Sequence, residues 1–286
     1  MRNHRLTRIS AISKIPLPEE CKVFNPVDFD RVSQLKNGGF GQLEIVQNNE
    51  SREFFVKKTF RFFDDPRLCS MAEAEVKVNS SVTHPNIVKC LGVYSRPGTV
   101  CFLLEQMAGD MTGFKSRDEK ELASISFQVL KALKDMSILH LDVKPGNILR
   151  DGNRSIFKLA DFGKARVVPV EEEIVVKCGT TLYTAPEATL PGLHVLASSP
   201  AATGAYKVDV FCFGLSMLEI FHGWYPLRNV PSSSVHSLLP SILKTGSEEL
   251  KSFLSNCLKT NPIERMCVED LITHPFIVQV LYLLGK

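Results

Sequence analysis

Short apolar runs separated by polar turns dominate the first third of the chain. Residues 66–82 interrupt them with apolar side chains at helical spacing, and His84-Pro85 ends this helix because the residue before a proline disfavours the α conformation. The pattern therefore predicts a strand-rich first third with one helix. The strand-like runs are Val32–Leu35, Leu43–Val46, Phe54–Phe60, Ile87–Tyr94 and Thr99–Glu105.

After Gly109 the apolar positions repeat at helical spacing. Helical segments also dominate from Val208 to the end of the sequence, whereas residues 188–206 are rich in Ala, Ser, Pro and Gly and are interpreted as an inserted loop. We therefore expect an α+β chain with two lobes, in which a ligand would favour the cleft between them. One helical face consists of Leu122, Ile125, Val129, Leu130 and Leu133.

Composition and charge narrow the class of protein. Hydrophobic residues make up 44% of the 286 residues and charged residues 23%, which excludes wholesale disorder, a collagen-like fibre and a coiled-coil rod. The net charge of +3 favours neither nucleic acid nor an anionic membrane as the main partner. The eight cysteines form no CxxC pair, so zinc and redox motifs are absent and a reducing compartment is expected.

The sequence shows no stretch typical of a transmembrane or secretory segment. The longest apolar run, Val210–Phe221, has twelve residues and contains Glu219, which makes it too short to cross a bilayer. The basic N-terminal segment has no apolar core, so we interpret it as a solvated tail, with a transit peptide as the alternative. We expect a soluble intracellular protein, cytoplasmic and/or nuclear, without membrane insertion.

Two segments of the strand-rich region carry residues suited to phosphate binding. The loop Leu35–Gly41 lies between strand-like runs, and its glycines would let backbone N–H groups approach a phosphate. Lys57 and Lys58 follow on the next strand, and Glu75 lies on the helix; a strand lysine paired with such a glutamate aims its ammonium group at a phosphate. Taken alone, these features are also typical of a Gly-rich hairpin and of solvated surface charges.

The segment Ile138–Leu149 concentrates the chemistry. Asp142, Lys144 at the second position after it and Asn147 at the fifth place a proton acceptor, a cation and a metal ligand on one loop. The motif Asp161-Phe162-Gly163 begins fourteen residues after Asn147, and its aspartate supplies the other metal ligand. These residues point to phosphoryl transfer.

Together with the segment Gly179–Glu187, these motifs, in this order and at these spacings, resemble the eukaryotic protein kinase family, serine/threonine type. The resemblance covers about residues 29–279 and implies a bilobal protein-kinase fold with a small β-rich N-lobe and a larger α-helical C-lobe. The implied organisation is a flexible basic leader over 1–28, an N-lobe over about 29–105, a C-lobe over about 110–279 and a tail over 280–286.

The resemblance also assigns roles to the loop residues. Asp142 matches the base that accepts the proton of the substrate hydroxyl, and Lys144 matches the lysine that stabilises the transferring phosphoryl group. Asn147 and Asp161 match the magnesium ligands. The implied cofactors are ATP and Mg²⁺, with two ions, and the implied partners are protein substrates and not nucleic acid.

On the nucleotide side, the resemblance places Leu104 as the gatekeeper and the following residues as the hinge that binds adenine through its backbone, with Asp110 near the ribose. In the C-lobe, Asp209 resembles a structural anchor and Arg265 is expected to pair with Glu187. The implied cofactor-binding positions are Leu35, Gly38, Gly41, Leu43, Lys58, Lys57, Glu75, Glu105, Met107, Asp110 and Asp161.

The sequence leaves a choice between two consecutive lysines. Side chains alternate along a strand, so only one of them can face the cleft. With Lys57 in the site, Phe55 would crowd the adenine and Thr59 would replace an apolar residue; with Lys58, the changes are mild. We therefore favour Lys58, and Lys57 remains the alternative.

Two departures from the family pattern bear on function. Lys36 stands at the usual first glycine of the loop, which suggests an altered nucleotide affinity. Leu141 replaces the arginine that normally receives the activation-loop phosphate, and the segment Lys164–Cys178 contains no Ser, Thr or Tyr. We therefore expect activity without phosphorylation of that segment. Thr180, whose hydroxyl could bridge Asp142 and Lys144, fits the serine/threonine class.

The His-Leu-Asp form of residues 140–142 is weakly similar to that of kinases that inhibit cyclin-dependent kinases and of a germ-cell kinase that feeds the mitogen-activated pathway. The expected function is a serine/threonine protein kinase. The alternative is a kinase-fold scaffold or pseudokinase that binds nucleotide without efficient turnover, against which the intact loop residues argue.

Overall fold

We describe the fold from a computed structural model of the chain. It describes residues 22–35, 41–61, 67–96, 98–136, 138–167, 173–175, 181–189, 194–196 and 204–283. The described residues fall into two compact units, one within Met1–Met107 together with Asp161–Lys164 and the other within Ala108–Ala160 and Ala165–Lys286.

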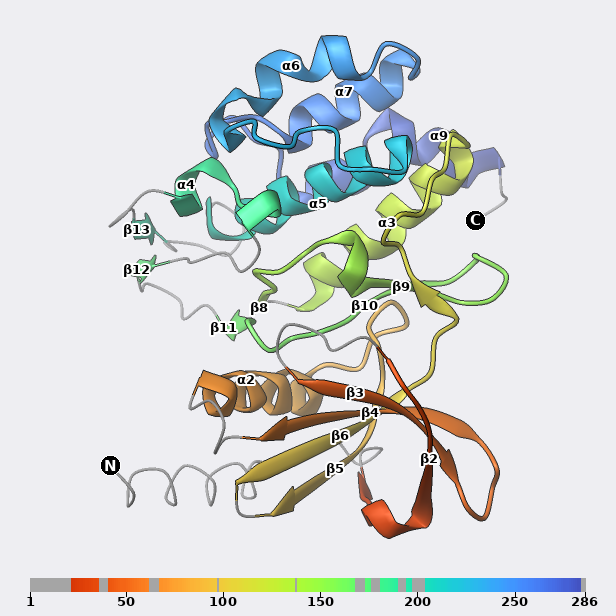
Figure 1. Cartoon of the computed structure of the whole chain (residues 1–286). Coiled ribbons are helices and arrows are strands. Elements are labelled where there is room, and N and C mark those ends of the chain that lie inside the picture. The colour runs from red at the N-terminus through yellow and green to blue at the C-terminus, as the bar shows by residue number, and fades with distance from the viewer. Residues whose placement is uncertain are drawn as a thin grey trace. The chain divides into compact units, whose positions relative to one another are not determined.

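The first unit is built on a six-stranded sheet with the order β1-β5-β6-β4-β3-β2 (Figure 1). All neighbouring strands run antiparallel except β1, which runs parallel to β5. The antiparallel five-stranded part followed by a largely helical region confirms the predicted fold class. The strands are β1 Lys22–Val23, β2 Phe29–Gln34, β3 Gln42–Asn48, β4 Phe54–Arg61, β5 Cys90–Arg96 and β6 Thr99–Glu105.

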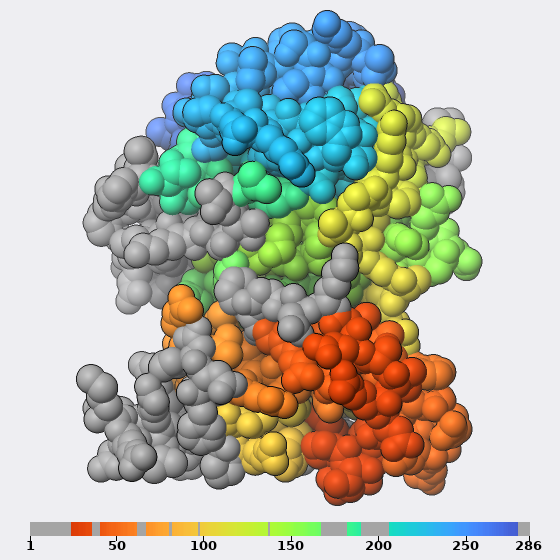
Figure 2. Space-filling model, viewed as in Figure 1, coloured from red at the N-terminus to blue at the C-terminus, as the bar shows by residue number. Residues whose placement is uncertain are grey.

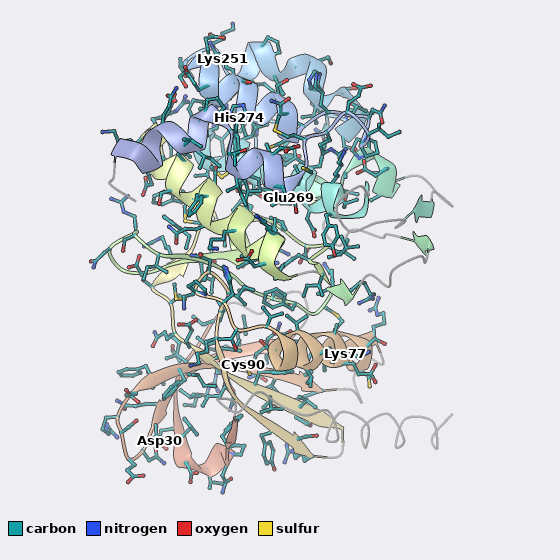
Figure 3. The ribbon with its side chains drawn as sticks, turned by 180° about the vertical axis from the view of Figure 1, so that it is seen from behind. Asp30, Lys77, Cys90, Lys251, Glu269 and His274 are labelled. Carbon is teal, nitrogen blue, oxygen red and sulfur yellow. The ribbon has the colours of Figure 1, made fainter. Side chains whose placement is uncertain are left out.

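Helix α2 (Arg67–Ser81) covers one face of this sheet (Figure 1). Its residues Ala72 and Val76 pack with Phe60 and Phe102, all nearly inaccessible to solvent, and the two phenylalanine rings meet edge to face. Figure 3 labels Cys90 on β5 and Lys77 on α2, the two elements that enclose this cluster. The predicted helix over residues 66–82 is therefore confirmed, and its apolar stripe is what holds it on the sheet.

An aromatic cluster covers the other face of the sheet. Phe24 packs edge to face on Phe29, which packs in the same way on Phe55, and Phe24 also contacts Tyr94. Between these rings and the sheet lie buried aliphatic and thiol side chains. Because both faces are covered, β6 is mostly buried, in keeping with its apolar sequence, whereas β4 carries Lys57 half-buried and Lys58 buried within the sheet.

The end of the expected leader belongs to this unit. Residues Lys22–Val23 pair with β5, Phe24 is only 8% exposed, and the 3-10 helix η1 (Pro26–Asp28), capped by the side chain of Asn25, leads into β2. The ordered fold therefore begins before residue 29, while residues 1–21 lie outside the described part of the chain. In the space-filling view the first strands, in red, form a large part of the visible surface of this unit (Figure 2).

The second unit is mainly helical. Its core lies between α3 (Glu119–Met136) and α5 (Gly204–His222), and the helical face predicted for residues 122–133 is buried as expected. Figure 3 labels His274 among the C-terminal helices. The shorter helices are α4 Pro186–Thr189, α6 Val235–Ile242, α7 Glu248–Cys257, α8 Val268–Ile272 and α9 Pro275–Leu283, with the 3-10 helices η2 Pro145–Asn147, η3 Thr181–Tyr183 and η4 Ser232–Ser234.

Small strand pairs position the loops of this unit. The sheet β10-β9-β7 and the pairs β11-β8 and β12-β13 are all antiparallel. The strands are β7 Gly109–Asp110, β8 Ile138–Leu139, β9 Ile148–Arg150, β10 Phe157–Leu159, β11 Arg166–Val167, β12 Glu173–Val175 and β13 His194–Leu196. Residues 188–206 were expected to form an inserted loop, but His194–Leu196 within them form β13, which pairs with β12. The composition of this segment could not predict the pairing, because it depends on a partner strand elsewhere in the chain.

The apolar run Val210–Phe221 lies within α5 and is buried in the helical unit. Across the described ranges, no helix combines the length and the apolar character needed to span a bilayer. The apolar composition of α5 therefore reflects its buried position in the helical unit, where it packs against α3, α7 and α8.

Candidate active site

Lys58 lies at the centre of a buried ionic cluster in the first unit. Its ammonium group donates to Oε2 of Glu75 at 2.6 Å and to Oδ1 of Asp161 at 2.8 Å. The side chains of Lys58 and Glu75 are 5% and 2% exposed, respectively. Strand β4, helix α2 and the segment that begins at Asp161 thus bring together three residues expected to take part in nucleotide binding.

Lys57 points to the opposite face of the same strand. Its ammonium group lies 2.9 Å from Oε2 of Glu44, the residue directly opposite it on β3, whereas Leu43 faces Lys58. Alternation along the strand separates the two lysines, as the sequence analysis expected. The structure therefore places Lys58, and not Lys57, beside Glu75.

Burial and charge act against each other in this cluster. Burial by itself lowers the pKa of Lys58, but the attraction of Asp161 and Glu75 outweighs it and leaves the pKa above its ordinary value. Burial raises the pKa of Glu75 to about 7, although the charge of Lys58 pulls it down. Lys58 is thus held as a cation within the buried cluster.

The motif Asp161-Phe162-Gly163 has a constrained backbone. Asp161 has φ of 67°, the left-handed region that side chains disfavour, and its Oδ1 also accepts the N–H of Gly163 at 3.4 Å. A Cβ at position 163 would lie 2.9 Å from the terminal methyl of Met71 on α2, so only glycine fits without a shift. Strain of this kind gathers at functional sites, where the surrounding contacts enforce it.

The ends of the Gly-rich loop are defined by β2 and β3. The N–H of Leu35 donates to the carbonyl of Leu43 at 3.0 Å, which closes the base of the hairpin. Gly41 has φ of 157°, and a Cβ there would lie 3.2 Å from the carbonyl oxygen of Thr59, so a side chain would crowd β4. The middle of the loop, with Lys36 and Gly38, lies outside the described residues.

The expected hinge follows β6. Glu105 makes two hydrogen bonds to Lys89, the residue before β5: its N–H donates to the carbonyl of Lys89 at 3.0 Å, and its Oε1 accepts the N–H of Lys89 at 2.6 Å. Met107 is half-buried, and Leu104 packs on the core beneath α2. In the second unit, Asp110 is exposed and its Oδ1 accepts the N–H of Thr112 at 2.7 Å.

The loop Leu141–Asn147 of the second unit converges on one carboxylate. Oδ2 of Asp142 accepts hydrogen bonds from Nζ of Lys144 at 2.8 Å and from Nδ2 of Asn147 at 3.2 Å. The same amide also donates to the carbonyl of Asp142 at 2.8 Å. Asp142, Lys144 and Asn147, the three residues that the sequence marked as carrying the chemistry, therefore form one hydrogen-bonded group, in which Asp142 is 4% exposed.

His140 fixes the backbone of Asp142, a role that the sequence analysis missed. Its Nδ1 accepts the N–H of Asp142 at 3.2 Å, so the ring proton sits on Nε2, which lies 3.1 Å from the carbonyl of Ala160 and donates to it. The ring thereby links the loop to the residue before Asp161. The sequence feature that could have predicted this role is the position of a histidine two residues before the aspartate.

Asp209 on α5 binds the backbone of this loop. Its two oxygens accept the N–H groups of His140 at 2.7 Å and Leu141 at 2.8 Å. Leu141 is buried and has φ of 62°, so Asp209 stabilises a left-handed conformation that leucine rarely adopts. Burial raises the pKa of Asp209 to about 7, although the two N–H bonds lower it. The predicted anchor role of Asp209 is confirmed.

A second buried ion pair links α4 to the segment after α7. Arg265 donates to both oxygens of Glu187, at 2.5 Å and 3.0 Å, and to the carbonyl of Lys207 at 2.6 Å. Its guanidinium also lies 4.8 Å from the ring centre of Phe211. The pairing predicted from the sequence is confirmed. The ion pair fixes Glu187, the last residue of the segment Gly179–Glu187.

The donor atoms suit a divalent cation with oxygen ligands. In the first unit Asp161 offers a carboxylate, and in the second unit Asn147 offers a side-chain amide; each is a hard oxygen ligand of the kind that Mg²⁺ prefers together with phosphate oxygens and water. Thr180 lies outside the described residues, so its expected bridge stays a prediction.

The sequence pattern of a family described as "Protein kinase domain" matches residues 29–277. Mitogen-activated protein kinase kinase 8 of Arabidopsis thaliana is 30% identical over 269 residues, which cover 89% of this chain and 84% of that protein. An Aurora kinase of Encephalitozoon cuniculi is 28% identical over 262 residues, or 86% of this chain and 92% of that protein.

Proposed function

Because this chain belongs to the protein kinase family, we propose that it transfers the γ-phosphoryl group of ATP to serine and threonine hydroxyls of proteins, without phosphorylation of its activation loop. Membership of the family implies ATP with a divalent metal, generally Mg²⁺, and protein substrates. The observation that carries the proposal is the buried contact of Lys58 with Glu75 and Asp161.

In this proposal the first unit binds the phosphates. Lys58, kept charged and oriented by Glu75, donates to phosphate oxygens, and Asp161 holds Mg²⁺. Two Mg²⁺ ions are proposed, and the metal supplies neutralisation of the phosphate charge when bound. Gly41 lets the loop pass close to β4, and the backbone around Glu105 and Met107 receives the adenine.

The second unit acts on the substrate hydroxyl. Asp142 accepts the hydroxyl proton on its carboxylate, while Lys144 carries positive charge toward the transferring group and Asn147 supplies the other metal ligand. His140 and Asp209 keep Asp142 in place through the backbone. Catalysis then rests mostly on positioning and on charge stabilisation.

The proposed independence from phosphorylation rests on Leu141. A buried leucine offers no cation to a phosphate, so a phosphorylated segment would gain no charge-assisted contact there. The segment Lys164–Cys178 also contains no hydroxyl to modify. Lys144, at the second position after Asp142, supports the serine/threonine class.

Transfer of radiolabelled phosphate from ATP to casein, followed by identification of the labelled amino acids, tests the proposal. We expect phosphoserine and phosphothreonine from the wild type, before and after phosphatase treatment, and no transfer by Asp142→Asn. A rise in melting temperature with Mg-ATP but no transfer by the wild type would instead assign a nucleotide-binding scaffold. Loss of transfer through dephosphorylation of Thr180 or Thr181 would contradict the independence from phosphorylation.

The sequence His140-Leu141-Asp142 supports a more specific cellular role. We propose that the protein acts in the cell cycle or in the mitogen-activated pathway, as do the kinases that share this sequence. Inactive cyclin-dependent kinase and inactive MAP kinase kinase, offered as substrates in parallel, distinguish the two. Phosphorylation of neither protein would remove the support for this placement.

A further inference from the structure

Glu44 forms an ionic cluster on the sheet face opposite Lys58. Its side chain is only 9% exposed, and each of its oxygens has a cation: Oε1 lies 2.9 Å from Nε of Arg31, and Oε2 lies 2.9 Å from Nζ of Lys57. Gln42 adds a hydrogen bond to Oε1 at 3.2 Å. The carboxylate is thus buried, doubly paired and directly opposite Lys57 across the β3–β4 ladder.

The sequence of β4 is ambiguous in register. Two phenylalanines and two lysines stand in consecutive pairs, Phe54-Phe55 and Lys57-Lys58, so a slip of one residue would put Lys57 where Lys58 now meets Glu75. Such a slip exchanges the faces of every side chain in the strand. Phe60 resists it, because Thr59 would then enter the core beneath α2.

The slip would also remove the direct partner of Glu44. Val56 would take the place of Lys57 in the ladder and leave the buried carboxylate with Arg31, whose side chain is 54% exposed. Removing one partner of a buried ion pair lowers the free energy of unfolding, because the remaining charge is shielded from water and no longer fully compensated by an opposite charge. Glu44 therefore favours the observed register through Lys57.

We propose that Glu44 is a positioning residue for phosphoryl transfer: by holding Lys57 on the outer face of the sheet, it leaves Lys58 as the lysine that reaches Glu75 and Asp161. The inference rests on the proposed function, because it names the residue that selects between two lysines for the same site. Glu44 acts only through Lys57 and contacts neither Glu75 nor Lys58 in the described contacts.

Covalent labelling with a fluorosulfonylbenzoyl ester of adenosine tests the inference without requiring turnover. A lysine amine near the bound nucleoside displaces fluoride and forms a sulfonamide, and peptide mass spectrometry identifies which lysine carries it. We expect label on Lys58 alone in the wild type. In Glu44→Leu we expect roughly a tenth or more of the label on Lys57, because the outer face no longer holds that ammonium group.

The double variant Glu44→Leu/Lys57→Leu is the rescue. With no second lysine present, labelling returns to Lys58 alone. The KM for ATP, raised about fivefold in Glu44→Leu, returns to within about twofold of the wild type. Glu50→Leu makes the same chemical change at an exposed turn position and leaves label and KM unchanged. If Glu44→Leu does not fold, Glu44→Gln replaces it in the experiment. This variant keeps the size of the side chain, and we expect it to shift the label in the same direction.

The outcomes separate the inference from the proposed function. Label on Lys58 alone in both Glu44 variants, with an unchanged KM, would overturn the positioning role even if their melting temperatures fall, because a merely structural role lowers stability without moving the label. Absence of label on Lys58 in the wild type would overturn it too. A shift of label in a protein that transfers no phosphate would uphold it while the proposed turnover fails.

Discussion

The ammonium group of Lys58 lies 2.6 Å from Glu75, while that of the preceding residue, Lys57, lies 2.9 Å from Glu44 on the other face of the sheet. Two consecutive residues of the same type therefore serve two unrelated clusters. The alternation of the strand separates them, and the partners decide what each does.

Replacing each lysine by methionine separates their contributions. We expect Lys58→Met to lower kcat/KM for ATP by about 10²-fold or more, because a preorganised cation next to the phosphates is lost. Lys57→Met is the matched control and leaves kcat/KM within about threefold, since its ammonium group faces away from the cluster. Steady-state phosphorylation of casein measures both. Equal losses in the two variants would contradict the assignment of Lys58.

The free energy of unfolding is expected to depend on pH through Asp209. Its pKa is about 7 in the folded protein and 3.8 ordinarily, so between these values only the folded chain keeps the proton. The unfolding free energy is therefore highest below pH 4 as far as this group is concerned, and falls as pH rises to 7, by on the order of 4 kcal/mol.

Urea unfolding of the wild type and of Asp209→Asn at pH 5, 6, 7 and 8 measures this dependence. The variant cannot titrate at position 209, so its curve is flatter than that of the wild type up to pH 7 and parallel to it above. Asp30→Asn, at an exposed position, retains the wild-type slope. Identical slopes for the wild type and Asp209→Asn would show that burial does not hold the proton on this carboxyl group.

The ion pair of Arg265 and Glu187 is expected to contribute strongly when only one partner is removed. Glu187→Gln leaves a guanidinium with no exposed surface and no opposite charge, and lowers the free energy of unfolding by about 3–5 kcal/mol. Glu248→Gln, in an exposed pair with Lys251, changes it by less than about 1 kcal/mol. Urea unfolding at constant pH measures both. A loss below 1 kcal/mol for Glu187→Gln would contradict the importance of the pair.

Phe24 tests where the folded domain begins. Truncation by Phe24→Ala removes a ring that packs on Phe29 and Tyr94, and we expect the free energy of unfolding to fall by about 3–5 kcal/mol. Val27→Ala, three residues later but 74% exposed, changes it by no more than about 0.5 kcal/mol. Thermal unfolding of both variants distinguishes a packed segment from a solvated leader, for which neither change would matter.

The sequence by itself determined the fold class, a helix over residues 66–82 and the candidate chemistry of Asp142, Asn147 and Asp161. These conclusions rest on spacing within short segments, where the period of a helix or strand and the order of residue types are local properties. Even the preference for Lys58 followed from alternation, because neighbouring side chains of a strand face opposite ways whatever the rest of the chain does.

Only the tertiary structure decided which distant groups hold those residues. Asp209 binds the N–H of His140 from 69 positions away, and the left-handed conformation of Leu141 exists because that carboxylate enforces it. The strand pairing of residues 22–23 and the partnership of Glu44 with Lys57 also depend on which segments the sheet brings side by side. Such contacts depend on the packing of the whole unit, so the local periodicity of the sequence does not predict them.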